Sequence, residues 1–342
     1  MAMKQEEIDY RITHLPSLEP SPMPWSIRRE PWVRESKLEE ILREYDFHGG
    51  KIPTHNGKLM PVSAAMKMDW ECGRIYPGRI ILGPTSGNAG IEGGLNAPAY
   101  GCEFRALINT KKVPPGKQCH LEAAGAKIEP LPGGVSAHDY ARELADKKGY
   151  YFYDQYSHNG SKIGHIPTMD HVDRELRRLG EIPTMAFTIL GSCSTWYAMR
   201  EFLAPKWPQL VPIGVASLPG AEEVPGSRSI PRLEELAQIP ESIVSEMLTK
   251  GTLNFKDVVT NVKKLDVYDF DAELYQVYDM SVGPTAAQLK LSSYRYLEMH
   301  WRRFGNFEAF MNQHEKIVLI RFYVDMPLPY FEDQEFLNAF RK

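Results

Sequence analysis

Short apolar segments that alternate with helical ones constrain the fold of this 342-residue chain more than any other feature. Residues 79–82 (Arg-Ile-Ile-Leu) have the composition of a buried strand, and a small-residue segment with helical character follows them. The same order recurs twice before residue 150. Strands are predicted at 79–82, 104–108 and 126–131, and helices at 62–72, 88–97, 116–124 and 137–148. This alternation predicts a parallel sheet with helices on both faces.

A second alternating block fills the C-terminal half of the chain. Helices are predicted at 170–179, 194–203, 271–278 and 284–299, and strands at 184–190, 210–216 and 316–324. Two Pro-Gly pairs predict that the intervening segment 217–232 is a loop. The sequence therefore predicts an α/β protein of two domains, each a mostly parallel sheet flanked by helices, with a cofactor in the cleft between them.

The N-terminal region is rich in proline and cannot be mostly helical. We expect residues 1–35 to form an arm that packs on the body of the protein or on a partner subunit. Ser36 and Glu39 have the spacing of a capping box, which predicts a short helix over 37–45. This helix would open a smaller, mobile domain at 36–160, and 161–342 would form the larger domain.

Charge and cysteine content argue against several classes of protein. The formal net charge of −4 gives no electrostatic reason to expect nucleic-acid or membrane binding. No stretch approaches the roughly 18 apolar residues of a membrane span, and the acidic N-terminus lacks the apolar core of a signal peptide. The four cysteines are scattered, which favours reduced thiols and argues against zinc. We expect a cytoplasmic protein that needs no metal.

The turn at residues 83–90 (Gly-Pro-Thr-Ser-Gly-Asn-Ala-Gly) carries the first chemical signal. It connects a predicted strand to a predicted helix, so its backbone N–H groups converge on one point where the helix dipole favours an anion. Lys58 lies upstream, and a lysine that reaches the same point would add amine chemistry to anion binding.

A second turn of small residues occurs at 190–195 (Leu-Gly-Ser-Cys-Ser-Thr), again between an apolar strand and a helix. Backbone N–H groups and hydroxyls of this kind suit a phosphate monoester. Two anion sites and one lysine would match a phosphorylated aldehyde cofactor together with an amino-acid carboxylate.

These motifs resemble those of the cysteine synthase and cystathionine β-synthase family of pyridoxal-phosphate enzymes, which is fold type II or the tryptophan synthase β superfamily. The resemblance covers roughly residues 50 to 290. Residues 84–90 resemble the family's substrate-carboxylate loop. Lys58 precedes Pro77-Gly78 at a spacing similar to that between the family's Schiff-base lysine and its own Pro-Gly pair. Further matching segments are 115–126, Gln155-Tyr156, 191–195 and 282–285.

The resemblance implies a role for each matching residue. Lys58 would hold pyridoxal 5'-phosphate and act as the base at the substrate Cα. The implied substrate-binding residues are Thr85, Ser86, Gly87, Asn88, Ala89 and Gln155, and Asn88 would also bind the cofactor ring oxygen. The implied phosphate-binding residues are Gly191, Ser192, Cys193, Ser194 and Thr195. Thr285 would face the pyridine nitrogen, where a neutral hydroxyl makes a weaker electron sink than a carboxylate would.

The resemblance also implies a reaction and an assembly. We expect β-replacement on a serine- or cysteine-derived amino acid, with an O-acetylserine-like donor and a thiol or other small nucleophile, through an aminoacrylate intermediate in a homodimer. One alternative is β-elimination by a lyase or desulfhydrase. Another is a catalytically silent relative with a binding or regulatory role, because Gly57 and Leu59 flank the lysine and Trp196 follows the phosphate loop, where the family has other residues.

Overall fold

The computed structural model describes residues 17–20, 41–48, 57–85, 87–278, 284–304, 316–322 and 338–339. A smaller, four-stranded sheet has the order β5-β4-β3-β6, and every pair in it is parallel. Its strands are β3 (Ile80–Gly83), β4 (Glu103–Ile108), β5 (Lys127–Pro130) and β6 (Tyr151–Phe152). The first three confirm the strands predicted in this part of the chain.

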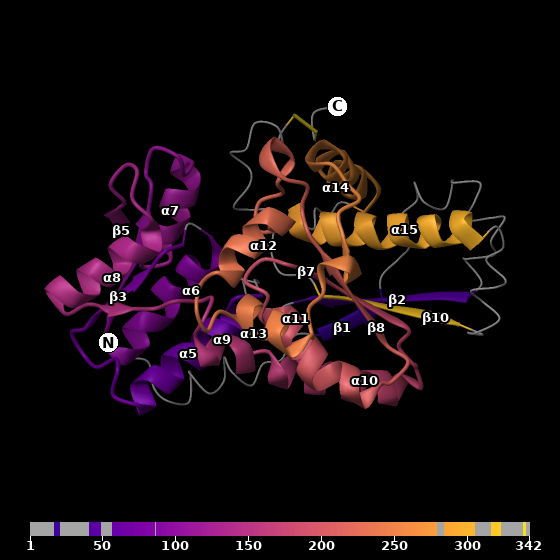
Figure 1. Cartoon of the computed structure of the whole chain (residues 1–342), viewed down its shortest axis with the longest axis horizontal. Helices are drawn as coiled ribbons and strands as arrows, with labels where there is room; N and C mark the ends of the chain where they lie inside the picture. Colours follow the sequence, from indigo (N-terminus) through magenta and orange to yellow (C-terminus); the bar gives the residue numbers. More distant parts are fainter. Residues whose placement is uncertain are drawn as a thin grey trace.

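A larger, six-stranded sheet has the order β1-β2-β10-β7-β8-β9. Only β1 and β2 pair in antiparallel fashion, so the sheet is mostly parallel. Its strands are β1 (Ser17–Pro20), β2 (Leu42–His48), β7 (Met185–Ile189), β8 (Val211–Val215), β9 (Val258–Val259) and β10 (Ile317–Phe322). The two sheets lie in different parts of the molecule (Figure 1), which confirms the predicted α/β class.

The helices around the smaller sheet are α5 (Leu59–Glu71), α6 (Asn88–Asn96), α7 (Pro115–Ala123), α8 (Ala137–Lys148) and α9 (Asn159–Ile163). Helix α9 lies directly against α5, the helix that follows Lys58. A Cβ on Gly160 would come within 2.3 Å of Ala65 Cα, and one on Gly164 within 2.5 Å of Pro61 Cα. Glycine therefore permits the close approach that holds the start of α5 in place.

The helices around the larger sheet are α10 (Ile166–Leu179), α11 (Ser194–Ala198), α12 (Ile230–Ala237), α13 (Ile243–Lys250), α14 (Lys264–Tyr278) and α15 (Pro284–Phe304). Alternate residues of β10 pack on opposite faces of this sheet. Leu319 belongs to the apolar cluster that contains Leu289 of α15, whereas Ile320 belongs to the cluster that contains Met169 of α10. Helices thus cover both faces, with α15 and α10 on opposite sides of the sheet in Figure 1.

The helix predicted at 37–45 is wrong at residues 42–45, which belong to strand β2, whereas Ile41 is helical. The strand pairs in parallel with β10 and therefore belongs to the larger sheet, whereas residues 37–45 were predicted to lie in the smaller domain. Buried charges explain the difference. Arg321 of β10, which is fully buried, contacts Glu44 at 2.7 Å and Asp46 at 2.6 Å. Residues 36–40 lie outside the described residues.

Most other predicted elements are confirmed, with local differences. The helix predicted at 194–203 is α11 followed by a π-helical turn at Met199–Leu203. The segment 217–232 is mostly irregular as predicted, but α12 begins within it at Ile230. Helices α9 and α13 and strands β1, β6 and β9 were not predicted. Of the N-terminal arm, the structure describes only Ser17–Pro20, which forms β1.

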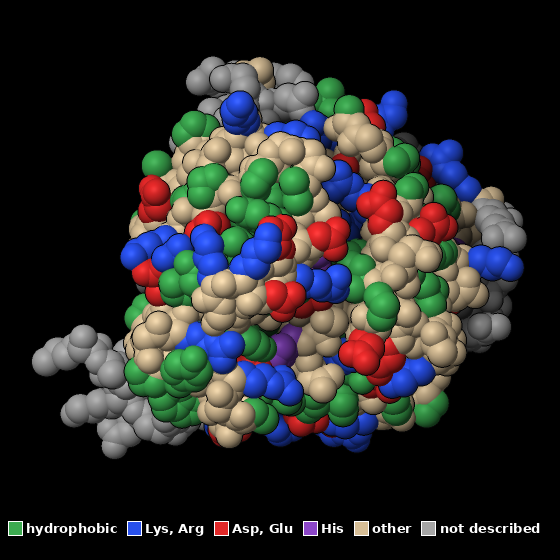
Figure 2. Space-filling view, turned by 60° about the vertical axis from the view of Figure 1, so that its left-hand side comes forward, with side chains coloured by type: hydrophobic (Ala, Val, Ile, Leu, Met, Phe, Trp, Pro, Cys, Tyr) green, Lys and Arg blue, Asp and Glu red, His purple; other side chains and the backbone are tan. Residues whose placement is uncertain are grey.

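No helix among the described residues has both the length and the apolar character needed to span a membrane. On the face shown in Figure 2, Lys and Arg side chains are interspersed with Asp and Glu side chains. All four cysteines are free thiols.

Candidate functional site

A cavity of about 430 Å³ lies where the two parts of the chain meet. The predicted site residues that line it are Lys58, Thr85, Gly87, Asn88, Ala89, Gln155, Gly191, Ser192, Cys193, Ser194, Thr195 and Thr285. The structure thus brings together every predicted site residue except Ser86, which lies outside the described residues. These residues come from the carboxyl ends of strands in both sheets and from the starts of the helices that follow, the usual position of ligands in α/β proteins.

Lys58 immediately precedes α5, and its side chain donates a hydrogen bond to Ser192 Oγ across the cavity. Burial lowers the pKa of Lys58 to about 8; Cys193 acts in the opposite direction, and the positive charge of Arg228 lowers the pKa further. An amine with this pKa is partly unprotonated near neutral pH, which is the state that attacks an aldehyde.

Most described residues of the loop at 83–90 line the cavity at the start of a helix, where an anion could bind. It follows β3, and α6 begins at Asn88 after Gly87, whose backbone is extended and whose N–H donates to Thr85 Oγ1 at 3.3 Å. Gly90 allows a close approach to α7, because a Cβ there would come within 2.6 Å of Leu121 Cδ2. The start of α6 therefore opens on the cavity that Lys58 also lines.

The loop at 190–195 forms the opposite wall. A Cβ on Gly191 would come within 2.7 Å of the Gly226 carbonyl oxygen, so only glycine leaves room for both backbones. Cys193 has a φ of 64°, in the left-handed region that favours glycine. Ser192 Oγ and Ser194 Oγ lie 3.1 Å apart. The result is a buried turn at the start of α11 whose backbone and hydroxyl groups line the cavity.

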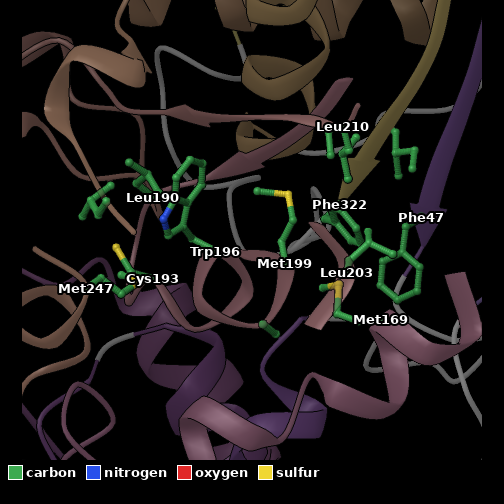
Figure 3. Packing of buried hydrophobic residues seen from close by; sticks show 14 of the residues in the cluster. Phe47, Met169, Leu190, Cys193, Trp196, Met199, Leu203, Leu210, Met247 and Phe322 are labelled. Carbon is green, nitrogen blue, oxygen red and sulfur yellow. The ribbon is translucent and has the colours of Figure 1, made fainter. Parts of the chain in front are cut away.

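The bulky residues near this loop pack away from the cavity. Trp196 is 1% exposed, donates from Nε1 to the Thr252 carbonyl oxygen at 3.1 Å, and lies beside Leu190 and Met199 (Figure 3). Burial raises the pKa of Cys193 to about 12, so this thiol stays protonated and packs as a small apolar side chain. Trp196 therefore supports the loop without narrowing the cavity.

Several lining residues were not singled out from the sequence, among them Lys117, Glu223, Arg228 and Arg232. The last three belong to the predicted loop that follows β8. Because β8 is the parallel neighbour of β7, the loops after both strands lie at the same edge of the sheet. This adjacency could have identified these residues, but it becomes apparent only when the order of the strands in the sheet is known.

His165 was not assigned a role from the sequence, yet it contacts the loop at 190–195, where the resemblance implies phosphate binding. Its Nε2 lies 3.3 Å from Thr195 Oγ1. Burial lowers the pKa of His165 to about 3, and the nearby Lys58 charge adds to this effect. The ring is therefore neutral, and it holds the Thr195 hydroxyl in place without adding charge.

The donor set fits a phosphorylated aldehyde. A lysine with a lowered pKa lies between two helix starts, and glycine at 191 lets the turn that lines the cavity pack closely against the Gly226 backbone. Among the described residues, no group of three histidine, cysteine or acidic side chains could hold a metal ion.

Comparisons with known proteins agree with this geometry. The family described as "Pyridoxal-phosphate dependent enzyme" matches residues 53–292. A search of curated proteins gives no match. Among solved structures, the O-acetylserine-dependent cystathionine β-synthase of Helicobacter pylori is similar, with a TM-score of 0.72, 17% identity and coverage of 97% of this chain and 99% of that one.

Two further structures show the same fold. A hydrogen sulfide-producing enzyme of Fusobacterium nucleatum has a TM-score of 0.73 and 14% identity, and the match covers 97% of this chain and 99% of that one. An O-ureido-L-serine synthase has a TM-score of 0.71 and 17% identity, with 95% and 94% of the two chains covered.

Proposed function

Because the chain belongs to the family of pyridoxal-phosphate-dependent enzymes, we propose that it catalyses β-replacement on a serine- or cysteine-derived amino acid. The observation that carries this proposal is the position of Lys58, whose amine has a pKa of about 8 and lies between an anion cradle at 85–89 and a phosphate-type loop at 191–195. The similar structures described as serine-based synthases support the same reaction.

Pyridoxal phosphate, when bound, withdraws electrons from the substrate Cα. The residues of this chain would supply binding and proton transfer. The backbone and hydroxyls of 191–195 would hold the phosphate, and Lys58 would bond covalently to the cofactor and then move the proton at the substrate Cα. The start of α6, with Thr85 and Gln155, would hold the substrate carboxylate. Thr285 would give the pyridine nitrogen a neutral partner, which suits loss of a β-substituent.

Product analysis tests the reaction. Purified protein loaded with pyridoxal phosphate is expected to convert O-acetylserine and sulfide to cysteine and acetate. Release of pyruvate and ammonia that added sulfide does not suppress would favour the alternative of β-elimination; the similar Fusobacterium enzyme is described as producing hydrogen sulfide. Full occupancy of Lys58 by the cofactor without turnover of any amino acid would favour the alternative of a silent relative.

Substitutions in the carboxylate cradle are expected to affect the Michaelis constant. Thr85→Ala and Gln155→Ala should each raise the KM for the donor amino acid about 10-fold, because a charge-assisted hydrogen bond contributes about 1.5 kcal/mol or more. Cofactor content, measured from visible absorbance relative to protein absorbance, should stay unchanged in both variants. Loss of cofactor in either variant would contradict the assignment of this loop to substrate.

We also propose that the smaller part of the chain closes over the bound substrate and excludes water, and that the protein acts in the cytoplasm as a homodimer. Light scattering on the purified protein measures the assembly directly, and a monomeric mass would contradict the homodimer.

A further inference from the structure

The turn at 154–158 separates two cavities. Gln155 and Tyr156 line the cavity of the candidate site. Asp154 and Ser157 line a second cavity of about 860 Å³, to which residues of α8 and α13 also contribute. Space on both sides leaves this turn fewer neighbours to pack against, so its shape depends on its hydrogen bonds.

Asp154 accepts most of the hydrogen bonds that shape the turn. Its Oδ1 accepts from the Tyr156 N–H at 3.0 Å, which closes the backbone around Gln155. Its Oδ2 accepts from the Ser157 hydroxyl at 2.8 Å, and its backbone carbonyl oxygen accepts from the Ser157 N–H at 3.3 Å. One buried side chain thus fixes the residues on both sides of Gln155.

His138, the second residue of α8, ties Asp154 to the smaller part of the chain. Burial would raise the pKa of Asp154, but the hydrogen bonds that it accepts, the one from His138 first, bring it below its usual value. The side chain is therefore a carboxylate, so His138 Nε2, at 3.3 Å from Asp154 Oδ1, is the donor. The His138 ring also packs on the rings of Phe152 and Tyr156, with centroids 5.8 and 5.4 Å away.

Tyr156 ties the other end of the turn to the larger part of the chain. Its carbonyl oxygen accepts from the Ile243 N–H at 2.7 Å, at the start of α13, and its hydroxyl accepts from Arg228 Nη2. Gln155 lies between these two anchors. Its backbone is fixed from both parts of the chain at the point where it enters the cavity wall.

We propose that Asp154 and His138 are positioning residues that hold Gln155 against the substrate carboxylate. This inference rests on the proposed β-replacement, in which Gln155 binds that carboxylate. Neither Asp154 nor His138 lines the cavity of the candidate site, so both would act through the turn. Their loss should weaken binding of the amino acid and leave attachment of the cofactor to Lys58 unchanged.

A double-mutant cycle tests whether Asp154 acts through Gln155. In wild-type holoprotein, Asp154→Ala should raise the KM for the donor amino acid about 5- to 10-fold and change kcat less than about 3-fold, because hydrogen bonds that fix the turn are lost. In a Gln155→Ala background the same substitution should raise KM less than about 2-fold, since the side chain that it positions is absent. Asp154→Asn, which can still accept from the Tyr156 N–H, should recover part of the loss.

Two further variants control the cycle. His138→Phe keeps an aromatic ring against Phe152 but removes the donor, so it should raise KM in the same direction and also depend on Gln155; it replaces Asp154→Ala in the cycle if that variant does not fold. Asp139→Ala removes an exposed carboxylate from the adjacent position of α8 and should leave KM unchanged.

The same fold-change in both backgrounds, or an unchanged KM in Asp154→Ala, would overturn the proposal, because general loosening does not depend on Gln155. Hydrogen exchange separates this outcome from failure of the proposed reaction. In Asp154→Ala the Tyr156 N–H loses its acceptor, so one amide in a peptide covering 154–158 should exchange about 10-fold faster than in wild type. If no donor amino acid is turned over, β-replacement is wrong, and this exchange rate alone decides whether Asp154 holds the turn.

Discussion

Replacement of Lys58 by alanine is expected to lower turnover about 1,000-fold or more, because one side chain supplies both the covalent link to the cofactor and the base at the substrate Cα. The structure provides the physical basis. The amine lines the cavity between the two anion-binding loops, and burial brings its pKa to about 8. The variant should also lose the visible absorbance that a covalent cofactor gives.

Lys67 offers a matched control for this experiment. It lies on α5, the same helix that Lys58 precedes, but it does not line the cavity. Lys67→Ala should keep both absorbance and turnover. Borohydride reduction followed by peptide mass analysis locates the attached cofactor directly. A label on any lysine other than Lys58, or full turnover in Lys58→Ala, would remove Lys58 from the proposed mechanism.

The two loops of the cavity could be predicted from the sequence, because their chemistry depends on local sequence pattern. Strand β7 is recognisable because four of its five residues (Met-Ala-Phe-Thr-Ile) are apolar, and the loop after it is a short run of small residues. The loop at 83–90 is recognisable for the same reason. Both lie at strand-to-helix junctions, where chain order alone determines which groups face the ligand.

Features that depend on distant residues could not be predicted in this way. The apolar residues Leu42 and Tyr45 have helical spacing, yet both belong to strand β2. The deciding contact comes from Arg321, which is 275 residues away in the chain from Asp46. Arg228 was missed for a similar reason. Its place in the cavity wall follows from the pairing of β7 with β8, and its side chain is oriented by Tyr156. Local propensity carries no information about such partners.

The cluster of buried charges that determines the β2 strand should also dominate the stability of the larger sheet. Arg321 is fully buried and contacts Glu44, Asp46 and Ser293 Oγ, while Lys290 reaches Asp46 at 3.1 Å. Arg321→Met would remove the guanidinium from both Glu44, which keeps the hydrogen bond from the Tyr294 hydroxyl, and Asp46, which keeps its contact with Lys290.

We expect Arg321→Met to lower the free energy of unfolding by about 3–5 kcal/mol, because removal of one partner strands a charge in the interior, whereas loss of an exposed pair changes it by about 1 kcal/mol at most. Arg302 provides that exposed comparison, since it pairs with Glu298 on α15 at 2.6 Å and is 66% exposed. Urea denaturation of Arg321→Met and Arg302→Met measures the difference. Equal unfolding midpoints would show that the buried cluster contributes no more than a surface pair. Partial recovery in Arg321→Met with Glu44→Gln would identify the unpaired carboxylate as the source of the loss, because the second change removes the buried charge that the first one leaves unpaired.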